Sequence, residues 1–141
     1  MRKLDDELSA LAESIARKLI AEGFIVQRYG AYTTSSIYLK LDYGVCNSIR
    51  ISDHPGKRYL KYRYNIGPFV KEFRTEKDKY DRFYYRADKA KNMLKRIIED
   101  REFKKARYGE SGYRKLMQKN KSDNANSPGF WKKAVLLNKG V

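Results

Sequence analysis

One stretch of alternating apolar and polar residues decides the fold: SIYLKLDYGVCNSIRISDHPGKRYLKYRYNI, residues 36–66. Every second side chain is apolar in three runs of this stretch, which is the period of a strand with one covered face. The three runs are residues 36–41, 48–52 and 58–66. Turn-forming residues at 42–44 and 53–56 separate the runs, and such short connections favour antiparallel pairing. Together with a further run at 24–29, the pattern predicts a meander of about four strands.

On both sides of this stretch the spacing of apolar residues changes to that of a helix. The N-terminal apolar stripe consists of Leu4, Leu8, Leu11, Ile15 and Leu19. A second stripe begins at about Asp81 and consists of Phe83, Ala87, Ala90, Leu94 and Ile97. Gly109 and Gly112 interrupt the second pattern, after which residues 113–117 can form a short helix. The sequence therefore predicts an α+β fold, with an N-terminal helix, a long C-terminal helix and a short helix packed on one sheet face.

The chain divides by composition into a main domain and a tail. We expect a single α+β domain over residues 1–119, followed by a polar linker and an apolar tail over residues 120–141. Residues 69–73 are ambiguous and can form a further edge strand. The tail carries Phe130, Trp131 and the apolar run at 135–137, so it either folds back on the domain or docks on a partner.

Positive charge is concentrated in the second half of the chain. Between Lys57 and Lys121 there are 22 basic and 9 acidic residues, a net charge of +13 out of +15 for the whole chain. So much charge of one sign weakens the compact state unless an anionic partner lies nearby. The charge therefore indicates binding to a nucleic acid, a nucleoprotein or an acidic groove.

Two groups of residues are candidates for this binding. Basic and aromatic side chains that alternate on the uncovered sheet face are typical of proteins that bind single-stranded nucleic acid. They are Tyr38, Lys40, Arg50, Tyr59, Lys61 and Arg63. The second group is a basic helix surface that can follow phosphates or enter an acidic groove. It consists of Lys89, Lys91, Lys95, Arg96, Arg101, Lys104, Lys105 and Arg107. In both cases the alternative is an ordinary solvated surface.

No combination of residues indicates catalysis, a metal or a cofactor. His54 is the single histidine, and with Asp53 alone it is a poor ligand set, so we expect both to hydrogen-bond the turn. Glu102 and Lys104 have the acid-x-lysine spacing of some nucleases, but no partner carboxylate precedes them on a strand. Cys46 is the single cysteine, so neither a disulfide nor a cysteine zinc site forms within the chain. We expect a protein that is not an enzyme.

The chain also lacks the features of membrane and secreted proteins. No stretch approaches 18 consecutive apolar residues, and the N-terminus has no continuous apolar segment. A single cysteine suits a reducing compartment, so we expect a location in the cytoplasm. The sequence leaves the oligomeric state open.

Three segments of the sheet region resemble a group of phage proteins. These are Ser36–Leu39, Ile49–His54 and Tyr62–Ile66. They are similar to segments of small proteins encoded by phages and prophages of Gram-positive bacteria, which include anti-CRISPR inhibitors of Cas9. The resemblance covers about residues 24–105 and brings no catalytic residues with it.

The resemblance implies an anti-CRISPR protein that binds a Cas9-type nuclease or its guide RNA or DNA. A basic inhibitor would bind exposed guide RNA, the bound duplex or an acidic protein patch, because the DNA channel of such a nuclease is itself basic. The alternative is a stand-alone, non-enzymatic RNA- or DNA-binding protein of a phage or mobile element. A metal-dependent nuclease is a third class, which the residues above disfavour.

Overall fold

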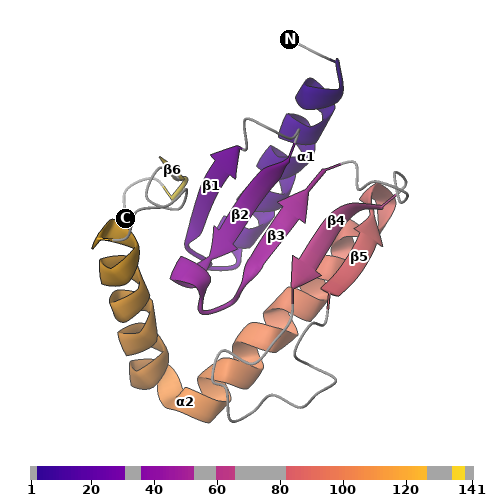
Figure 1. The fold of residues 1–141 in the computed structure, drawn as a ribbon. Helices are drawn as coiled ribbons and strands as arrows, with labels where there is room; N and C mark the ends of the chain where they lie inside the picture. Colours follow the sequence, from indigo (N-terminus) through magenta and orange to yellow (C-terminus); the bar gives the residue numbers. More distant parts are fainter. Residues whose placement is uncertain (1–2, 31–35, 53–59, 66–81, 127–134, 139–141) are drawn as a thin grey trace.

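The computed structural model describes residues 3–30, 36–52, 60–65, 82–126 and 135–138 (Figure 1). Two α-helices, six strands and two 3₁₀ turns follow one another in these ranges. In chain order the elements are α1 (Lys3–Ala21), β1 (Val26–Gly30), β2 (Ile37–Leu41), η1 (Asp42–Gly44), β3 (Ser48–Ile51), β4 (Leu60–Asn65), β5 (Arg82–Arg86), η3 (Ala87–Lys89), α2 (Ala90–Asn126) and β6 (Val135–Leu136).

The strands form one antiparallel sheet in the order β5-β4-β3-β2-β1-β6. Alternation along each strand sends one set of side chains into the core, as the sequence predicted. In β2, Ile37, Leu39 and Leu41 are buried, whereas Tyr38 and Lys40 between them are partly exposed. The α+β class and the antiparallel sheet are therefore confirmed.

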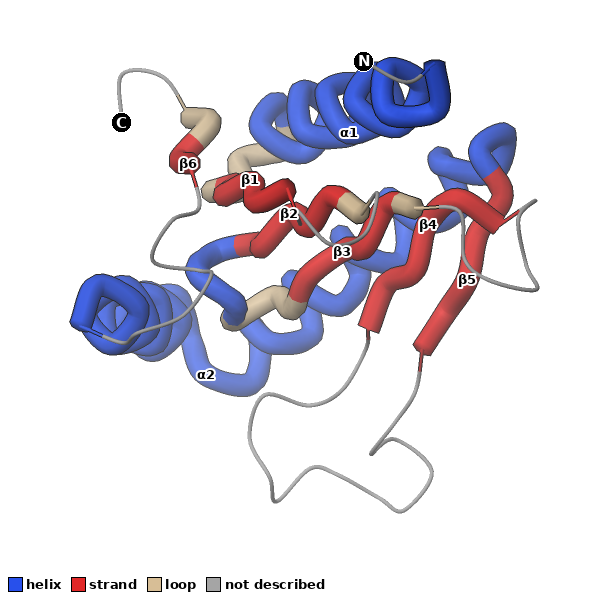
Figure 2. Tube along the Cα trace, turned by 45° about the horizontal axis from the view of Figure 1, so that its top comes forward, coloured by secondary structure: helices blue, strands red, loops and turns tan. Residues whose placement is uncertain are grey.

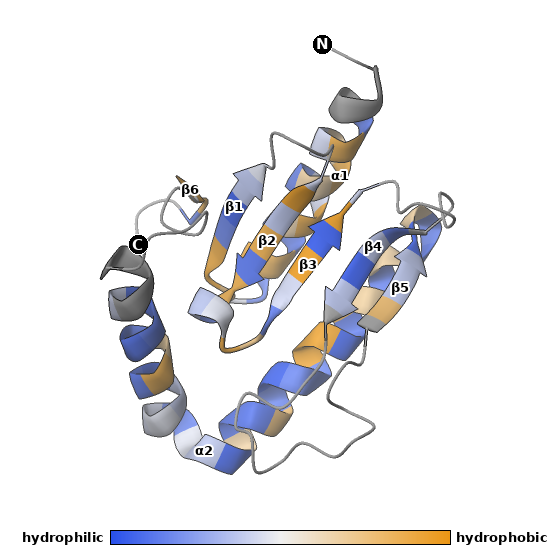
Figure 3. Ribbon diagram, viewed as in Figure 1, coloured by the Kyte–Doolittle hydropathy of each residue, from blue (hydrophilic) through white to orange (hydrophobic). Residues whose placement is uncertain are grey.

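Both helices lie on the same face of the sheet (Figures 1 and 2). Helix α1 packs on β1, β2 and β3, and the first part of α2 lies behind β4 and β5. Their apolar stripes meet the inward side chains of the strands in a single core, visible as the orange positions in Figure 3. Leu8, Ile15 and Leu19 enter it from α1, and Met93 and Ile97 enter it from α2. Each such side chain contributes about 1.5–3 kcal/mol on full burial. Neither of the two helices that the structure describes packs on the other face of the sheet, which we call the uncovered face.

The predicted start of the second helix was wrong. Residues 82–86 form strand β5, and α2 begins only at Ala90 after the 3₁₀ turn. The run Arg-Phe-Tyr-Tyr-Arg is rich in aromatic residues that favour a pleated sheet. It pairs with β4, with Tyr64 opposite Phe83 and Tyr62 opposite Tyr85. Pairing along the whole of β4 therefore outweighed the helical spacing of the apolar residues.

The predicted break in the helical pattern is present at Gly109, but the helical segment after it is longer than the short helix that we expected. Helix α2 continues to Asn126 and bends at Gly109, where the backbone has φ 79° and ψ 161°. The expected short helix at 113–117 is part of this continuation, and residues 120–126 are helical where we expected a linker. Asn120 explains part of the difference, because its side-chain amide donates to the Tyr43 carbonyl oxygen at 3.0 Å. Tertiary contacts of this kind override weak local propensity. The possible edge strand at 69–73 lies outside the described residues.

The tail returns to the sheet at its β1 edge. Val135 pairs with Arg28 and Leu136 with Gln27, and Leu137 packs against the core. The side-chain amide of Asn138 then acts like one more residue of the strand. It accepts a hydrogen bond from the Val26 N–H at 2.7 Å and donates one to the Phe24 carbonyl oxygen at 2.8 Å. Of the two alternatives for the tail, these contacts support folding back on the domain. Phe130 and Trp131 lie outside the described residues.

Replacing Asn138 tests how firmly the tail is held. Asn138→Ala removes both amide hydrogen bonds, and we expect the free energy of unfolding to fall by about 1–2 kcal/mol. Amide hydrogen exchange at Val26 and Leu137 should accelerate, while exchange in β3 stays slow. Asn92→Ala, at an exposed position of α2, is the matched control and should leave exchange at Val26 unchanged. Unaltered exchange in Asn138→Ala would show that the amide does not hold the tail.

Candidate nucleic-acid interface

A continuous row of tyrosine and arginine crosses the uncovered face of the sheet. Tyr29 lies opposite Tyr38, Tyr38 opposite Arg50, Arg50 opposite Arg63, and Arg63 opposite Tyr84. We call these five residues the outer row; each of them is partly exposed. The row spans β1 to β5, with aromatic rings at its two ends and two guanidinium groups in its centre. Directly opposed side chains in a sheet lie about 4.5–5.5 Å apart at Cβ, so the row is one connected surface.

No carboxylate neutralises this row from the strands themselves. None of the six strands that the structure describes contains Asp or Glu. Arg50 and Arg63 face each other directly, and like charges in that position destabilise a sheet. The Arg50 Nε donates to Ser36 Oγ at 3.2 Å, which fixes the guanidinium without neutralising it.

The predicted sheet-face residues lie where the period-two pattern placed them. Tyr38, Lys40, Arg50, Lys61 and Arg63 are all partly exposed on alternating positions, and Tyr59 lies outside the described residues. Sequence reasoning missed two members of the outer row. Tyr29 lay in a predicted strand whose register was unknown, and Tyr84 was assigned to a helix.

Lys40 extends along the sheet towards η1. A Cβ atom built on Gly44 would lie 2.9 Å from the Lys40 Cε and 3.7 Å from the Asn120 Nδ2. The methylene stem of Lys40 therefore packs beside the η1 backbone, next to α2. Desolvation at this position lowers the pKa of its ammonium group.

The predicted helix surface is divided between exposed and buried side chains. Lys105 is half-buried, with its ammonium 5.6 Å from the centre of the Tyr113 ring. Arg96 is exposed, and its guanidinium lies over the Phe83 ring at 4.4 Å. The exposed members of the set are Lys89, Lys91, Lys95, Arg96 and Arg107.

Arg101 and Lys104 do not belong to an exposed surface, which corrects the prediction. Arg101 is 7% exposed and Lys104 is 2% exposed. The Arg101 guanidinium stacks on the Phe24 ring at 3.7 Å and donates to the Glu22 carbonyl oxygen at 2.8 Å. The Lys104 ammonium donates to the Val45 carbonyl oxygen at 2.8 Å. Both cations therefore connect α2 to neighbouring segments of the chain.

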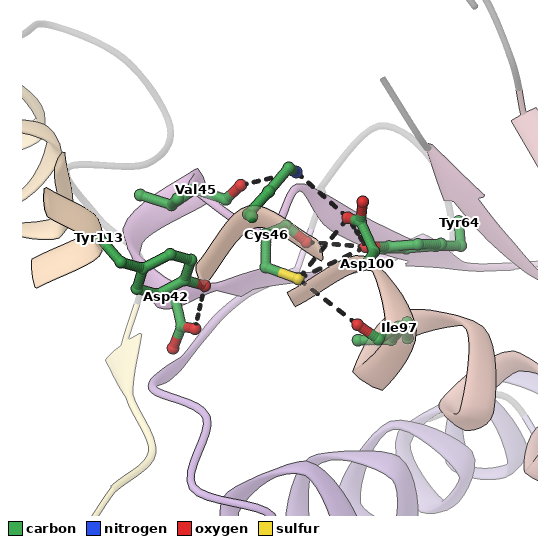
Figure 4. Close-up of polar contacts among 8 residues, drawn as sticks. Asp42, Val45, Cys46, Tyr64, Ile97, Asp100 and Tyr113 are labelled. Atoms are coloured by element: carbon green, nitrogen blue, oxygen red, sulfur yellow. Dashed lines mark hydrogen bonds and ion pairs between the residues drawn. The ribbon is translucent and has the colours of Figure 1, made fainter. Parts of the chain in front are cut away.

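Lys104 belongs to a buried polar cluster, drawn in Figure 4, beneath β3 and β4. Its ammonium lies 3.1 Å from Asp100 Oδ2, and the Tyr64 hydroxyl donates to the same oxygen at 2.8 Å. The Cys46 Sγ lies 3.6 Å from the Tyr64 hydroxyl oxygen and 3.8 Å from Asp100 Oδ2. A buried charge is tolerated when it is paired and hydrogen-bonded, as Asp100 is here.

This cluster holds its thiol and phenol in the neutral form. Burial, followed by the Asp100 charge, raises the pKa of the Cys46 thiol to about 12. Burial also raises the pKa of Tyr64 well above its usual value, with further contributions from Cys46 and Asp100. A neutral, buried thiol is neither a nucleophile nor a metal ligand, so the cluster stabilises the fold.

A second buried contact fixes the η1 turn. The Tyr113 hydroxyl donates to Asp42 Oδ2 at 2.5 Å, and the Ile25 N–H donates to Asp42 Oδ1 at 2.9 Å. Burial, followed by the charges of Cys46 and Asp42, raises the pKa of Tyr113. Asp42 and Tyr43 both adopt positive φ, at 51° and 55°. Such a conformation costs about 1–3 kcal/mol per residue, so these contacts are needed to maintain it.

The geometry gives no support to a nuclease centre. Glu102 is exposed, whereas Lys104 points into the protein towards Val45 and Asp100, so the two do not converge. In the ranges that the structure describes, no three residues among His, Cys, Asp and Glu are grouped to hold a metal ion. His54 and Asp53 lie outside these ranges.

Among the described helices, none is long and apolar enough to span a membrane. Comparison of the chain with protein-family models, with curated proteins and with solved structures gave no match.

The raised pKa of Cys46 makes stability depend on alkaline pH. Below its ordinary value of 9.0 the thiol is protonated in both states, and its contribution to stability is complete. Between pH 9.0 and about 12 the unfolded chain loses this proton while the folded chain retains it. The free energy of unfolding should therefore fall by about 1.4 kcal/mol per pH unit from this group.

Cys46→Ala removes that contribution, while Tyr64 and Tyr113 titrate in both proteins and lose only the part of their raised pKa that Cys46 supplies. Chemical denaturation at about pH 7, 9 and 11 should show the wild type losing stability more steeply than the variant above pH 9. A stability difference between the two proteins that is the same at every pH would contradict the burial of the neutral thiol.

Proposed function

We propose that the protein is a non-enzymatic single-stranded nucleic-acid-binding protein whose binding surface is the outer row. The observation that carries this proposal is the row itself. Tyr29 and Tyr38 lie at one end and Tyr84 at the other, with Arg50 and Arg63 between them and no acidic residue in the strands. Rings stack on bases while guanidinium groups pair with phosphates, which is how sheet surfaces bind unpaired strands.

Single strands fit this surface better than a duplex. Stacking requires bases whose faces are free, and a duplex hides them. Both α1 and the first part of α2 pack on the opposite face of the sheet, so neither stands beside the row to enter a groove. Five strands at about 4.8 Å spacing give the row a length of about 19 Å. Three tyrosines along that length suit two or three stacked bases.

The anti-CRISPR role implied by the resemblance stays a prediction. Binding of an exposed segment of guide RNA by the outer row would be one route to inhibition of a Cas9-type nuclease. The phage origin and the location in the cytoplasm of a bacterial host, rather than in a cytoplasm of any kind, depend on the same resemblance. Binding of single strands does not depend on it, so the two ideas can be tested separately.

Neighbouring tyrosines on β5 supply a matched test of the outer row. Tyr84 belongs to the row, whereas Tyr85 points to the core from the next position. Tyr84→Leu should weaken binding of fluorescent oligo(dT) or oligo(U) by about 1–3 kcal/mol per stacked base lost, measured by anisotropy. Tyr85→Leu should leave affinity within about twofold of the wild type at a temperature where both variants are folded.

Two further measurements complete that test: the salt dependence of affinity, and whether the oligonucleotide stays intact. The logarithm of affinity should fall linearly with the logarithm of salt, with a slope of about −0.7 per phosphate contact. Arg50→Gln should reduce the size of that slope. The oligonucleotide should be recovered intact after incubation with Mg²⁺ or Mn²⁺. Equal losses in Tyr84→Leu and Tyr85→Leu, or cleavage of the strand, would contradict the proposal.

A pull-down with Cas9 tests the anti-CRISPR prediction. Immobilised protein should capture Cas9 loaded with guide RNA and should not capture Cas9 without guide, because the guide supplies the exposed phosphates and bases. Tyr84→Leu should reduce this capture and Tyr85→Leu should not. Capture of free single strands without any capture of the loaded nuclease would favour the stand-alone binding protein.

A further inference from the structure

The part of α2 that follows the bend contains four basic residues and two acidic residues, Glu110 and Asp123. We call residues 110–126 the arm. Among its described side chains, four exposed cations accompany a single exposed carboxylate, Glu110. The four cations are Arg114, Lys115, Lys119 and Lys121. Between Asp88 and Arg107 there are eight basic and four acidic residues, so the proportion of basic to acidic residues is the same before and after the bend.

The bend at Gly109 separates the arm from the covered face of the sheet. In Figures 1 and 2 the arm stands apart from the strands, on the β1 side and next to η1. Three contacts hold it there. The Tyr113 hydroxyl bonds to Asp42, the Asn120 amide bonds to the Tyr43 carbonyl oxygen, and the Lys121 ammonium lies 5.7 Å from the centre of the Tyr43 ring.

The arm and the uncovered sheet face meet at Lys40. This residue lies on the uncovered face, two residues after Tyr38 of the outer row. Its Cε and the Asn120 Nδ2 both lie within 4 Å of the Cβ position built on Gly44. Lys40 therefore lies between the uncovered sheet face and the arm.

We propose that the arm is a phosphate-binding extension of the outer-row site. A single strand whose bases stack on the row would leave the sheet at the β1–β2 end, pass Lys40, and lay its backbone along the arm. The occupant is the sugar–phosphate chain of single-stranded RNA or DNA, because the arm offers exposed cations to phosphates but no exposed aromatic ring to bases among its described side chains. This inference rests on the proposed function and adds a length requirement to it.

The strained η1 turn makes the arm a fixed part of the site. Asp42, Tyr43 and Gly44 all have positive φ, and Asp42 is buried against Tyr113. The arm makes its hydrogen bonds to this turn, which directly follows β2. These bonds therefore fix the direction of the arm relative to the end of β2. Cations held in place lose less conformational entropy on binding than cations on a free helix.

Oligonucleotides of two lengths separate the arm from the row. A strand of about 4 nucleotides covers the row alone, and one of about 12 nucleotides also reaches the arm. The arm variant combines Arg114→Gln, Lys115→Gln and Lys119→Gln. The control combines Lys89→Gln, Lys91→Gln and Lys95→Gln, which removes the same charge from exposed positions before the bend.

We expect the arm variant to bind the longer strand about tenfold more weakly, with a salt slope smaller by about 2. It should bind the shorter strand as the wild type does. The control should stay within about twofold of the wild type at both lengths. Parallel measurements with oligo(dT) and with oligo(U) show whether DNA, RNA or both are bound. Circular dichroism confirms that each variant is folded.

The outcomes distinguish this inference from the proposed function. If the shorter strand depends on Tyr84 but the longer strand is indifferent to the arm variant, the inference is overturned and the outer row stands. Equal losses in the arm variant and the control would also overturn it, because they would indicate a general effect of net charge. If the wild type binds neither strand, or if Tyr84→Leu changes neither affinity, both ideas fail together.

Discussion

The buried carboxylate of Asp42 is the constraint on which the arrangement of the other elements depends. It accepts hydrogen bonds from the Ile25 N–H and the Tyr113 hydroxyl, and its own N–H donates to the Ile25 carbonyl oxygen at 2.8 Å. These contacts join the segment entering β1, the turn after β2 and the second part of α2. A buried carboxylate that lost either partner would carry a large desolvation cost. The contact thus fixes the corner at which sheet and arm meet.

The positive charge of the chain serves two separate purposes. Arg101 and Lys104 are buried, where they donate to the carbonyl oxygens of Glu22 and Val45 and so hold α2 against other segments. Cations on the uncovered sheet face and on the arm remain in contact with solvent. A count of charges along the sequence does not distinguish the two groups, which is why it placed Arg101 and Lys104 on the exposed helix surface.

The sheet was predictable from the sequence because its signal is local. Alternation in residues 36–52 fixes which side chains face the core, whatever the neighbouring strands do. Strand β5 was missed because Phe83 satisfies a helical spacing as well as a strand spacing, and only the free edge of β4 decides between them. The spacing of Met93, Ile97, Arg101 and Lys104 did contain the signal that the two cations lie on the buried stripe. This signal was overlooked because Lys and Arg side chains are rarely buried, so both residues were assigned to the exposed surface. The contact between Tyr113 and Asp42 joins residues far apart in the chain, so no pattern within a segment could reveal it.

The direction of the arm depends on the absence of a side chain at Gly109. At φ 79° and ψ 161°, Gly109 lies in a region of backbone space that is essentially restricted to glycine. A Cβ atom there would meet no other atom within 4 Å, so the restriction comes from the torsion angles alone and not from packing. The helix beyond it rises by about 1.5 Å per residue and forms a lever about 25 Å long. A substitution at position 109 would change the direction of the whole charged helix, although a Cβ atom there would meet no other atom within 4 Å.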